Sequence, residues 1–371
     1  ALPALMGDDG ERLIEALDHR LPVWTEDSFA GLLMNVAAGR IANRLDFGGT
    51  NFTVDAACGS SLAAVTLGVR DLQARNSDMV VVGGVDAIQN PFAFLCFSKT
   101  QALSPTGRCK PFDASADGIA ISEGFAAVVL KRLEDAERDG DRIYAVIRGV
   151  GSASDGRDRS LTAPRPEGQM RALRRAYEHA GVSPADVGLI EAHGTGTVAG
   201  DRAEIASLRR VFEEHGAARR SCAIGSVKSM IGHTKATAGV AGLGKAAMAV
   251  HHRVLPPTLH VDRPNPHADF DSSPFYPNIE ARPWIRPDGE RRRAGVSAFG
   301  FGGTNFHVVL EEYDGDPRGD RSLALDRLPA ELLLWRAETP DALADEVRSL
   351  AGRLEAGARP RLPDLALTLA S

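Results

Sequence analysis

The sequence predicts a layered α/β protein, and two observations carry this prediction. Short apolar runs alternate along the chain with longer segments of helical period. This alternation is typical of a sheet that is covered by helices. A reactive side chain also precedes a helical segment in each half of the chain, Cys58 in the first half and His233 in the second. The second observation indicates an internal duplication.

The expected strands are the short apolar runs. The run at 78–84 is continuous and ends in glycines, which predicts a buried parallel strand. The other expected strands cover residues 126–130, 144–150, 187–191, 223–227, 296–299 and 306–310.

The expected helices are the longer segments in which apolar residues recur with helical period. They cover residues 10–21, 29–45, 60–69, 167–180, 202–215 and 234–250. After them, residues 314–321 are rich in Asp, Gly and Arg and are expected to form an exposed linker. A strand-like run at 332–335 and a helix at 340–354 follow.

Composition excludes several classes of protein. The formal net charge of −6 gives no electrostatic basis for binding nucleic acid. No apolar run is long enough to cross a bilayer, and the first residues lack the pattern of a signal peptide. The four cysteines show no paired spacing, which indicates a reducing, cytoplasmic compartment instead of a disulfide framework or a zinc site.

Cys58 is the strongest candidate for a nucleophile. It follows a strand-like segment and precedes the helical segment that begins at Ser60, so its sulfur is expected at a helix N-terminus. Unpaired amides and the helix dipole favour the thiolate there. A free cysteine is most often a buried structural residue, but the small residues around Cys58 leave room for a substrate. The other three cysteines are interpreted as structural: Cys96, Cys109 and Cys222.

Two histidines lie in glycine-rich segments far downstream of Cys58. His193 begins a His-Gly-Thr-Gly-Thr segment, whose glycines let a ligand approach and whose threonines suit a long polar thioester arm. His233 follows Lys228 in a stretch otherwise poor in charge, and a charged neighbour commonly tunes the protonation of a histidine. Each histidine alone is equally consistent with a hydrogen-bonded structural residue. The loop at 300–305 lacks the lysine of a phosphate-binding loop.

Taken together, four segments resemble the ketosynthase (β-ketoacyl synthase) domains of the thiolase superfamily. They are 55–61 around Cys58, 191–197 with Asp201, 225–233 with Lys228 and His233, and 300–305. The resemblance extends from about residue 25 to residue 312. Segments 24–29, 39–45 and 196–204 look like those of type I iterative polyketide synthases of the enediyne and polyunsaturated-fatty-acid types.

The resemblance implies a thiolase-like α-β-α-β-α fold of two duplicated halves. Residues 1–145 would form the first half and carry Cys58, and residues 146–313 would form the second half and carry both histidines. Residues 314–371 would begin the linker that leads to an acyltransferase. The chain starts well inside the family's domain, so the first half is expected to be incomplete, with an exposed sheet edge and apolar surface. Gly59 stands where alanine is usual, a change expected to leave the thiol functional.

The resemblance also implies a decarboxylative Claisen condensation. Cys58 would attack an acyl thioester and hold the acyl chain covalently. A malonyl thioester on a carrier protein would then lose carbon dioxide, and His193 and His233 would stabilise the resulting enolate. The backbone amides of Cys58 and Phe301 would form the oxyanion hole, in which one donor is typically worth ~3 kcal/mol.

Further residues receive supporting roles from the resemblance. Lys228, paired with Glu204, would hold the local charge and the position of His233, with Asp201 also in support. Thr195 and Thr197 would contact the phosphopantetheine arm. Phe299 and Phe301 are candidates for a gate that admits malonyl only after acylation.

No metal or redox cofactor is expected, because the thioester supplies the activation. The expected partners are an acyl carrier protein, the adjacent acyltransferase and other synthase domains, and a second copy of the full-length parent. The chief alternative is a catalytically silent docking or acyl-transferring domain. Loss of Cys58 or His193 would have indicated such a domain, and both residues are present.

Other enzymes with related residues fit less well. A thiolase would need a second cysteine near the C-terminal glycine-rich loop, and 301–307 contains none. A Cys-His-Asn synthase is disfavoured by His233, and a cysteine hydrolase by the pair of histidines. Dinucleotide binding is rejected, because the sequence contains no strand-linked G-x-G-x-x-G motif with a following acidic residue.

Overall fold

The computed structural model describes residues 7–20, 23, 25–87, 89–157, 163–287, 289–315, 331–360 and 362–370. The chain divides into two compact units, Ala1–Asp55 and Ala56–Ser371. Among the described residues, no helix is both long enough and apolar enough to cross a membrane.

The described residues of the first unit form the helices α2 (Asp8–Asp18), α3 (Glu26–Leu32) and α4 (Asn35–Leu45). The single helix expected at 29–45 is therefore wrong, because Leu33 adopts an extended conformation that ends α3. Gly31 lies just before this break, and glycine is a weak helix former. Helix α3 begins with a capping box, in which the Thr25 backbone N–H donates to the Ser28 hydroxyl at 2.9 Å.

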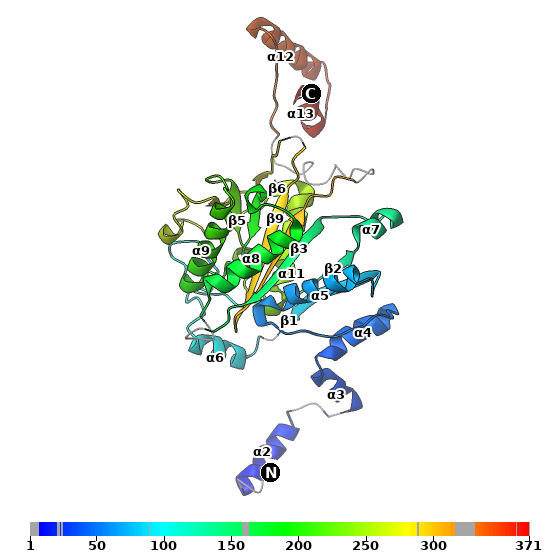
Figure 1. Cartoon of the computed structure of the whole chain (residues 1–371), viewed down its shortest axis with the longest axis vertical. Coiled ribbons are helices and arrows are strands. Elements are labelled where there is room, and N and C mark those ends of the chain that lie inside the picture. The colour runs from blue at the N-terminus through cyan, green and yellow to red at the C-terminus, as the bar shows by residue number, and fades with distance from the viewer. Residues whose placement is uncertain are drawn as a thin grey trace. The chain divides into compact units, whose positions relative to one another are not determined.

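A six-stranded mixed sheet organises the second unit (Figure 1). Its spatial order is β3 (Val146–Ser154), β10 (Thr304–Glu311), β9 (Arg293–Gly300), β4 (Leu189–Glu191), β5 (Cys222–Gly225) and β7 (Phe275–Pro277). Strand β10 runs antiparallel to both its neighbours, whereas β9, β4, β5 and β7 are parallel. The carboxyl ends of the parallel strands therefore meet at one edge of the sheet, which is where ligands commonly bind in α/β sheets.

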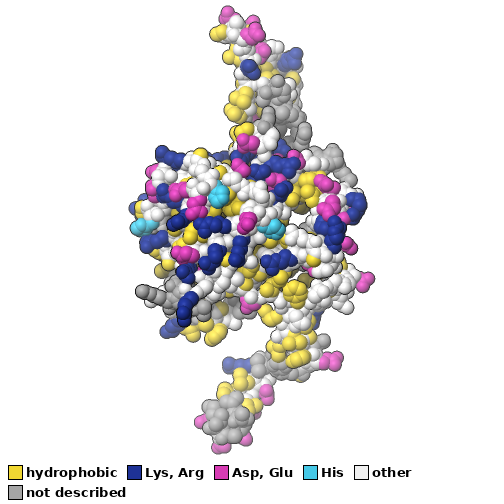
Figure 2. Space-filling view, in the orientation of Figure 1, with side chains coloured by type: hydrophobic (Ala, Val, Ile, Leu, Met, Phe, Trp, Pro, Cys, Tyr) yellow, Lys and Arg dark blue, Asp and Glu magenta, His cyan; other side chains and the backbone are white. Residues whose placement is uncertain are grey.

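Helices cover both faces of this sheet. On one face, α8 (Pro166–Ala180) and α9 (Val198–Glu214) pack over a core that includes Phe212, Tyr177 and Phe275. Over these two helices, side chains of both charges are interspersed on the surface (Figure 2). On the opposite face, α11 (Ala238–His252) separates the sheet from α5 (Ser60–Gln73) and from the second sheet. The layered α/β architecture predicted from the sequence is thereby confirmed.

The second sheet has two strands among the described residues, β1 (Met79–Asp86) and β2 (Gly124–Lys131), which pair antiparallel. The expectation of a buried parallel strand at 78–84 is therefore wrong. Alternate side chains of β1 and β2 are exposed and apolar on one face of the sheet: Met79, Val81, Val85, Phe125 and Val129. The apolar run is continuous in the sequence, but only its other face packs against α5.

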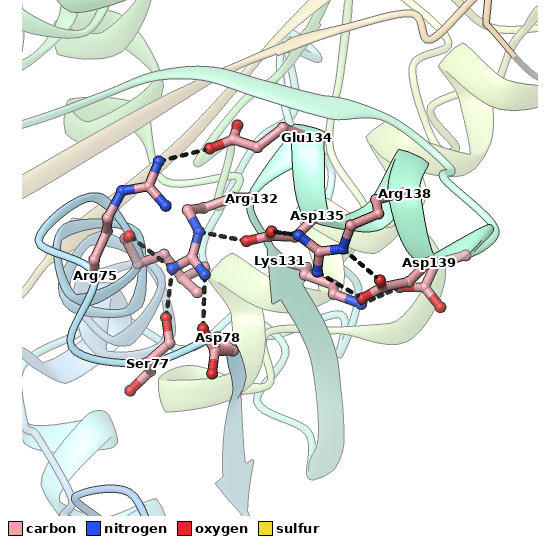
Figure 3. Close-up of polar contacts among 11 residues, drawn as sticks. Arg75, Ser77, Asp78, Lys131, Arg132, Glu134, Asp135, Arg138 and Asp139 are labelled. Carbon is pink, nitrogen blue, oxygen red and sulfur yellow. Dashed lines mark hydrogen bonds and ion pairs between the residues drawn. The ribbon is translucent and has the colours of Figure 1, made fainter.

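A cluster of charged side chains joins this sheet to its helices (Figure 3). Arg132 follows β2 and donates to the carbonyl oxygens of Leu72, at the end of α5, and of Ser77, just before β1. Its guanidinium also pairs with Asp78 at 2.8 Å and with Asp135. Asp135 belongs to α7 (Leu133–Asp139). One planar fork of donors thus ties the end of α5 and the start of β1 to α7, which follows β2.

The remaining elements are short or lie near the C-terminus. They are α6 (Pro91–Lys99), α10 (Lys228–Ile231), β6 (Val254–Leu255), β8 (Arg282–Pro283), α12 (Pro340–Glu355) and α13 (Leu362–Ala370). The helix expected at 340–354 is confirmed as α12. The strand expected at 332–335 is wrong, because no described strand pairs with it. Most of the expected linker at 314–321 lies outside the described residues.

The core contains a hydrogen-bonded histidine that gives the fold a dependence on pH. His307 of β10 is fully buried, with Nδ1 2.9 Å from the Ser297 hydroxyl and Nε2 3.2 Å from the Tyr177 hydroxyl. Burial lowers the pKa of His307 to about 3. The folded protein therefore keeps this ring neutral at pH values where an unfolded histidine is protonated.

We expect this histidine to weaken the fold in acid. Between pH 7 and pH 5, His307 takes up a proton in the unfolded chain but stays neutral in the folded chain. This difference lowers the free energy of unfolding by about 2 kcal/mol. His193 and His233 also lower the free energy of unfolding in acid, so the contribution of His307 must be isolated with a variant. The measurement is urea denaturation of wild type and of His307→Gln at both pH values. The variant should lose less stability than wild type, and an equal loss in the two proteins would contradict the prediction.

Candidate active site

Three site segments meet at the carboxyl edge of the six-stranded sheet. His193 follows β4, Lys228 follows β5, and Phe301 follows β9. Cys58 reaches the same place from the other layer, because the turn that carries it packs against β9. The structure thus brings together four motifs that lie up to 250 residues apart in the sequence, three of them because parallel strands end at the same edge of the sheet.

Cys58 lies in a tight turn, Ala57–Gly59, directly before α5. Ala57 adopts the left-handed conformation with φ 49°, which costs on the order of 1 kcal/mol for a residue other than glycine. The hydroxyl of Ser60 holds the turn by accepting from the Ala56 N–H at 2.9 Å and donating to the Ala57 carbonyl at 2.7 Å. The helix start expected at Cys58 is confirmed.

Two glycines allow the close packing around this turn. A Cβ atom at Gly300 would lie 2.2 Å from the carbonyl oxygen of Ala56, so only glycine lets β9 approach the turn. A Cβ atom at Gly59 would lie 2.9 Å from the ring of Phe306. Gly59, where the resemblance led us to expect an alanine, is therefore matched to a phenylalanine that occupies the adjacent space.

The Cys58 thiol is more basic than its place at a helix start suggests. Burial raises the pKa of Cys58, and this effect outweighs the opposing influence of the Lys228 charge and of two backbone amides. Those amides belong to Phe301 and to Cys58 itself. The expectation that the helix start favours the thiolate is therefore corrected for the resting site, because desolvation is the larger effect. The same two amides are the pair assigned to the oxyanion hole.

Both histidine rings are oriented by backbone amides. The N–H of Phe299 donates to Nδ1 of His193 at 3.3 Å, and the N–H of Lys235 donates to Nδ1 of His233 at 3.1 Å. A nitrogen that accepts a hydrogen bond carries no proton, so the neutral rings bear theirs on Nε2. The ring centroids lie 5.7 Å apart with the planes nearly perpendicular.

The electrostatic environment keeps both rings neutral. Burial, followed by the charge of Lys228, lowers the pKa of His193 and of His233 well below the ordinary range. Two neutral imidazoles with Nε2–H donors therefore lie side by side in the site. They can donate hydrogen bonds to a developing negative charge without giving up a proton.

Lys228 is buried, with its ammonium 2.6 Å from the carbonyl oxygen of His193. The direct ion pair expected between Lys228 and Glu204 is wrong. The Glu204 carboxylate instead accepts the backbone N–H groups of His193, at 2.7 Å, and Gly194, at 2.8 Å. Its oxygens are satisfied by these donors, and Glu204 affects Lys228 only through charge. Burial raises the pKa of Glu204 to about 7.

Asp201 supports the same loop from the first turn of α9. Its carboxylate accepts the N–H of Gly196 at 3.1 Å and the N–H of Phe112 at 2.8 Å. Burial raises the pKa of Asp201 to about 6. The supporting positions expected for Asp201 and Glu204 therefore hold the backbone around His193 in place.

The residues expected to contact substrate have different surroundings. The Thr197 hydroxyl caps α9 by accepting the N–H of Gly200 at 3.2 Å, and it lies 3.1 Å from the Thr195 hydroxyl. Phe299 is buried, with its ring centroid 5.5 Å from that of His193. The side chain of Phe301 is 59% exposed although its amide reaches Cys58. Only Phe301 combines a free side chain with a place at the thiol, as a gate would require.

Sequence reasoning missed two partly buried ion pairs beside the site. Glu191 pairs with Lys245 at 2.9 Å and accepts the N–H of Val227, the residue before Lys228. Asp86, the last residue of β1, pairs with Lys235 at 3.1 Å. Lys245 lies in the apolar segment expected to form α11, and a lone charge there was a signal for the first pair. The Asp86 partner lies far away in the sequence and left no such signal.

Comparison with known protein families matches nearly all of the chain. The model described as "Beta-ketoacyl synthase, N-terminal domain" matches residues 6–136, and that of the C-terminal domain matches residues 144–262. A third, "Ketoacyl-synthetase C-terminal extension", matches residues 264–368. The chain belongs to the β-ketoacyl synthase family. The ketosynthase resemblance of its four motifs is thereby confirmed.

Curated relatives include a subunit of a polyunsaturated fatty acid synthase and a polyketide synthase. A polyunsaturated fatty acid synthase of Thraustochytrium sp. is 43% identical over 94% of this chain and 12% of its own length. Polyketide synthase PksL of Bacillus subtilis is 45% identical over 80% of this chain and 6% of its own length. This ketosynthase chain therefore spans a small part of the curated relatives it matches.

Solved structures agree with the fold. The ketosynthase from module 6 of the bacillaene synthase from Bacillus subtilis 168 has a TM-score of 0.74 at 40% identity, and 90% of this chain covers 57% of that one. The oxazolomycin ketosynthase domain of Streptomyces albus JA3453 has a TM-score of 0.72 at 37% identity, again over 90% and 57%. The thiolase-like fold predicted from the ketosynthase resemblance is confirmed.

Proposed function

We propose that this ketosynthase chain catalyses decarboxylative condensation of a Cys58-bound acyl group with a malonyl thioester. The observation that carries the proposal is the pair of neutral imidazoles together with a thiol that two backbone amides approach, with the Lys228 charge acting on all three groups. A condensation needs two places where negative charge is stabilised, one at the acyl carbonyl and one at the enolate. The amide pair suits the first and the Nε2–H pair suits the second.

The acyl transfer begins with attack of the Cys58 sulfur on an acyl thioester. The carbonyl oxygen becomes an oxyanion, which the amides of Cys58 and Phe301 bind. The carbon–sulfur bond of the incoming thioester then breaks, and the departing thiol carries away the proton of Cys58. Burial keeps Cys58 protonated at rest, so the thiol stays in its weakly nucleophilic form until a substrate arrives.

The condensation begins when the malonyl thioester loses carbon dioxide. The electron pair of the broken carbon–carbon bond forms an enolate, and the Nε2–H groups of His193 and His233 hold its oxygen. The enolate carbon attacks the acyl carbonyl, and the bond to Cys58 breaks. The Cys58 thiolate leaves next to the Lys228 charge, which stabilises it.

The proposal also includes partner proteins and domains. Malonyl and acyl groups would arrive on the phosphopantetheine of an acyl carrier protein, from an adjacent acyltransferase domain, and the full-length parent would form a homodimer. The reaction needs no metal or redox cofactor, because the thioester supplies the activation. A reducing, cytoplasmic compartment would keep the Cys58 thiol free, as the mechanism requires.

The test is intact-protein mass spectrometry with an acyl thioester, followed by malonyl-acyl carrier protein. Wild type should gain the acyl mass and then lose it as a β-ketoacyl product. Cys58→Ala should gain no mass, whereas Cys96→Ala, which alters an exposed cysteine of α6, should behave as wild type. Acylation that malonyl does not discharge would support the alternative, an acyl-transferring or docking domain. Mass gain in Cys58→Ala would refute the nucleophile.

A further inference from the structure

The ion pair between Asp86 and Lys235 lies beside the site but has no role in the proposed mechanism. Their side chains are only 15% and 13% exposed, and the charged atoms are 3.1 Å apart. The Lys235 ammonium also donates to the carbonyl oxygen of Ser122 at 3.1 Å. Two partners therefore hold this lysine, one at the end of β1 and one in the segment before β2.

Lys235 has an unusual backbone conformation. Its φ is 49°, a left-handed value that costs on the order of 1 kcal/mol outside glycine. In this conformation its N–H donates to Nδ1 of His233 at 3.1 Å. Strained backbone persists where surrounding contacts enforce it, and the two contacts of the Lys235 side chain are placed to do so.

The contacts of Lys235 close a ring with His233. The N–H of Ser122 donates to the carbonyl oxygen of His233 at 3.0 Å, and the N–H of His233 donates to the carbonyl oxygen of Ala120 at 2.7 Å. The Ser122 carbonyl in turn accepts from the Lys235 ammonium. The backbone of His233 and the donor to its ring are thus fixed by one closed set of hydrogen bonds.

The charges of the pair also act on the reacting groups. Lys235, after burial and Lys228, lowers the pKa of His233, and Asp86 adds to the burial that raises the pKa of Cys58. Both effects keep the site in the state with a neutral ring and a protonated thiol.

We propose that Lys235, clamped by Asp86 and Ser122, is a positioning residue that holds His233 as the Nε2–H tautomer required for malonyl decarboxylation. The proposal deepens the condensing function and rests on it. Lys235 touches no reacting atom. It acts through its backbone N–H, which its side chain holds in an otherwise unfavourable conformation.

The test compares Lys235→Met, which keeps the aliphatic stem but removes the charge, with Lys235→Arg, which keeps the charge. Displacement of a reacting group by about 1 Å costs roughly 100-fold in rate. Lys235→Met should therefore lower kcat for malonyl decarboxylation by roughly 10–100-fold, with acylation of Cys58 changed less than about twofold. Lys235→Arg should retain most of the activity, and Asp86→Asn should resemble Lys235→Met.

Lys131→Met is the matched control. Lys131 also pairs with aspartates, Asp139 and Asp141, but at the far end of the same two-stranded sheet from Asp86. Its loss should leave decarboxylation unchanged. The proposal is overturned if each of the two variants, Lys235→Met and Lys131→Met, lowers decarboxylation and acylation to the same extent. Lys235 would then be merely structural.

A second readout does not depend on activity. In the protein labelled with ¹⁵N-histidine, long-range ¹H–¹⁵N spectra distinguish the two neutral tautomers, and His233→Gln identifies the signal of His233. Wild type should show a single Nε2–H tautomer, and Lys235→Met should show a mixture. An unchanged tautomer in Lys235→Met would overturn the proposal, even if wild type did not decarboxylate malonyl and the condensing function itself had failed.

Discussion

Replacing His233 by alanine is expected to slow condensation by roughly 10²–10³-fold, the usual effect of losing one donor to a developing oxyanion. The neutral Nε2–H of His233, a buried side chain, is one of two donors that would hold the enolate oxygen. Acylation of Cys58 uses the amides of Cys58 and Phe301 instead, so its rate should change little. Single-turnover measurements of acyl loading and of malonyl discharge separate the two steps.

The control for this variant is His215→Ala, which removes a histidine at the end of α9 that takes no part in the site. It should load and discharge as wild type does. If His233→Ala loses loading and discharge to the same extent, His233 assists Cys58 directly, and the assignment of the imidazole pair to the enolate is incorrect.

Replacing Phe212 by alanine is expected to lower the free energy of unfolding by about 3–5 kcal/mol, as is usual when a fully buried aromatic ring is removed. Phe212 is inaccessible to solvent and packs against Phe275, at 4.7 Å between ring centroids, and Tyr177, at 6.0 Å. These contacts join α9 to β7 and α8, so the cavity would lie where three elements meet. Urea denaturation followed by circular dichroism measures the loss.

Phe125→Ala is the matched control, because Phe125 is 72% exposed on the open face of β2. Its free energy of unfolding should change by less than about 0.5 kcal/mol. A loss below about 1 kcal/mol in Phe212→Ala would mean that the core around α9 collapses to fill the cavity.

Local patterns in the sequence were sufficient to predict most elements and to indicate the candidate reacting groups. The strand expected at 187–191 and the helix expected at 167–180 appear as β4 and α8, because their patterns depend on nearby residues. His193 follows a strand and Cys58 precedes a helix, so the motifs already contained the places where parallel strands end and helices begin. The family resemblance then assigned roles that no local pattern contains.

Predictions failed where the outcome depended on distant partners. The run at 78–84 has the composition of a strand buried on both faces, but burial depends on what packs against each face. The run at 332–335 has strand composition and no described strand beside it. The resemblance implied a pair between Glu204 and Lys228, yet two backbone amides satisfy the Glu204 carboxylate.

The sequence by itself determined the family, the layered α/β class and the order of most elements, and it indicated Cys58, His193 and His233 as candidate site residues, because each of these depends on residues close together in the chain. Only the tertiary structure decided the protonation of these groups. The charges and backbone amides that act on Cys58 come from β1 and from the segments that follow β5 and β9. The tautomer of His233 likewise depends on Lys235, whose strained conformation is held by Asp86, 149 residues earlier in the sequence. Electric fields and hydrogen-bond geometry act through space, and chain order does not encode the distances on which they depend.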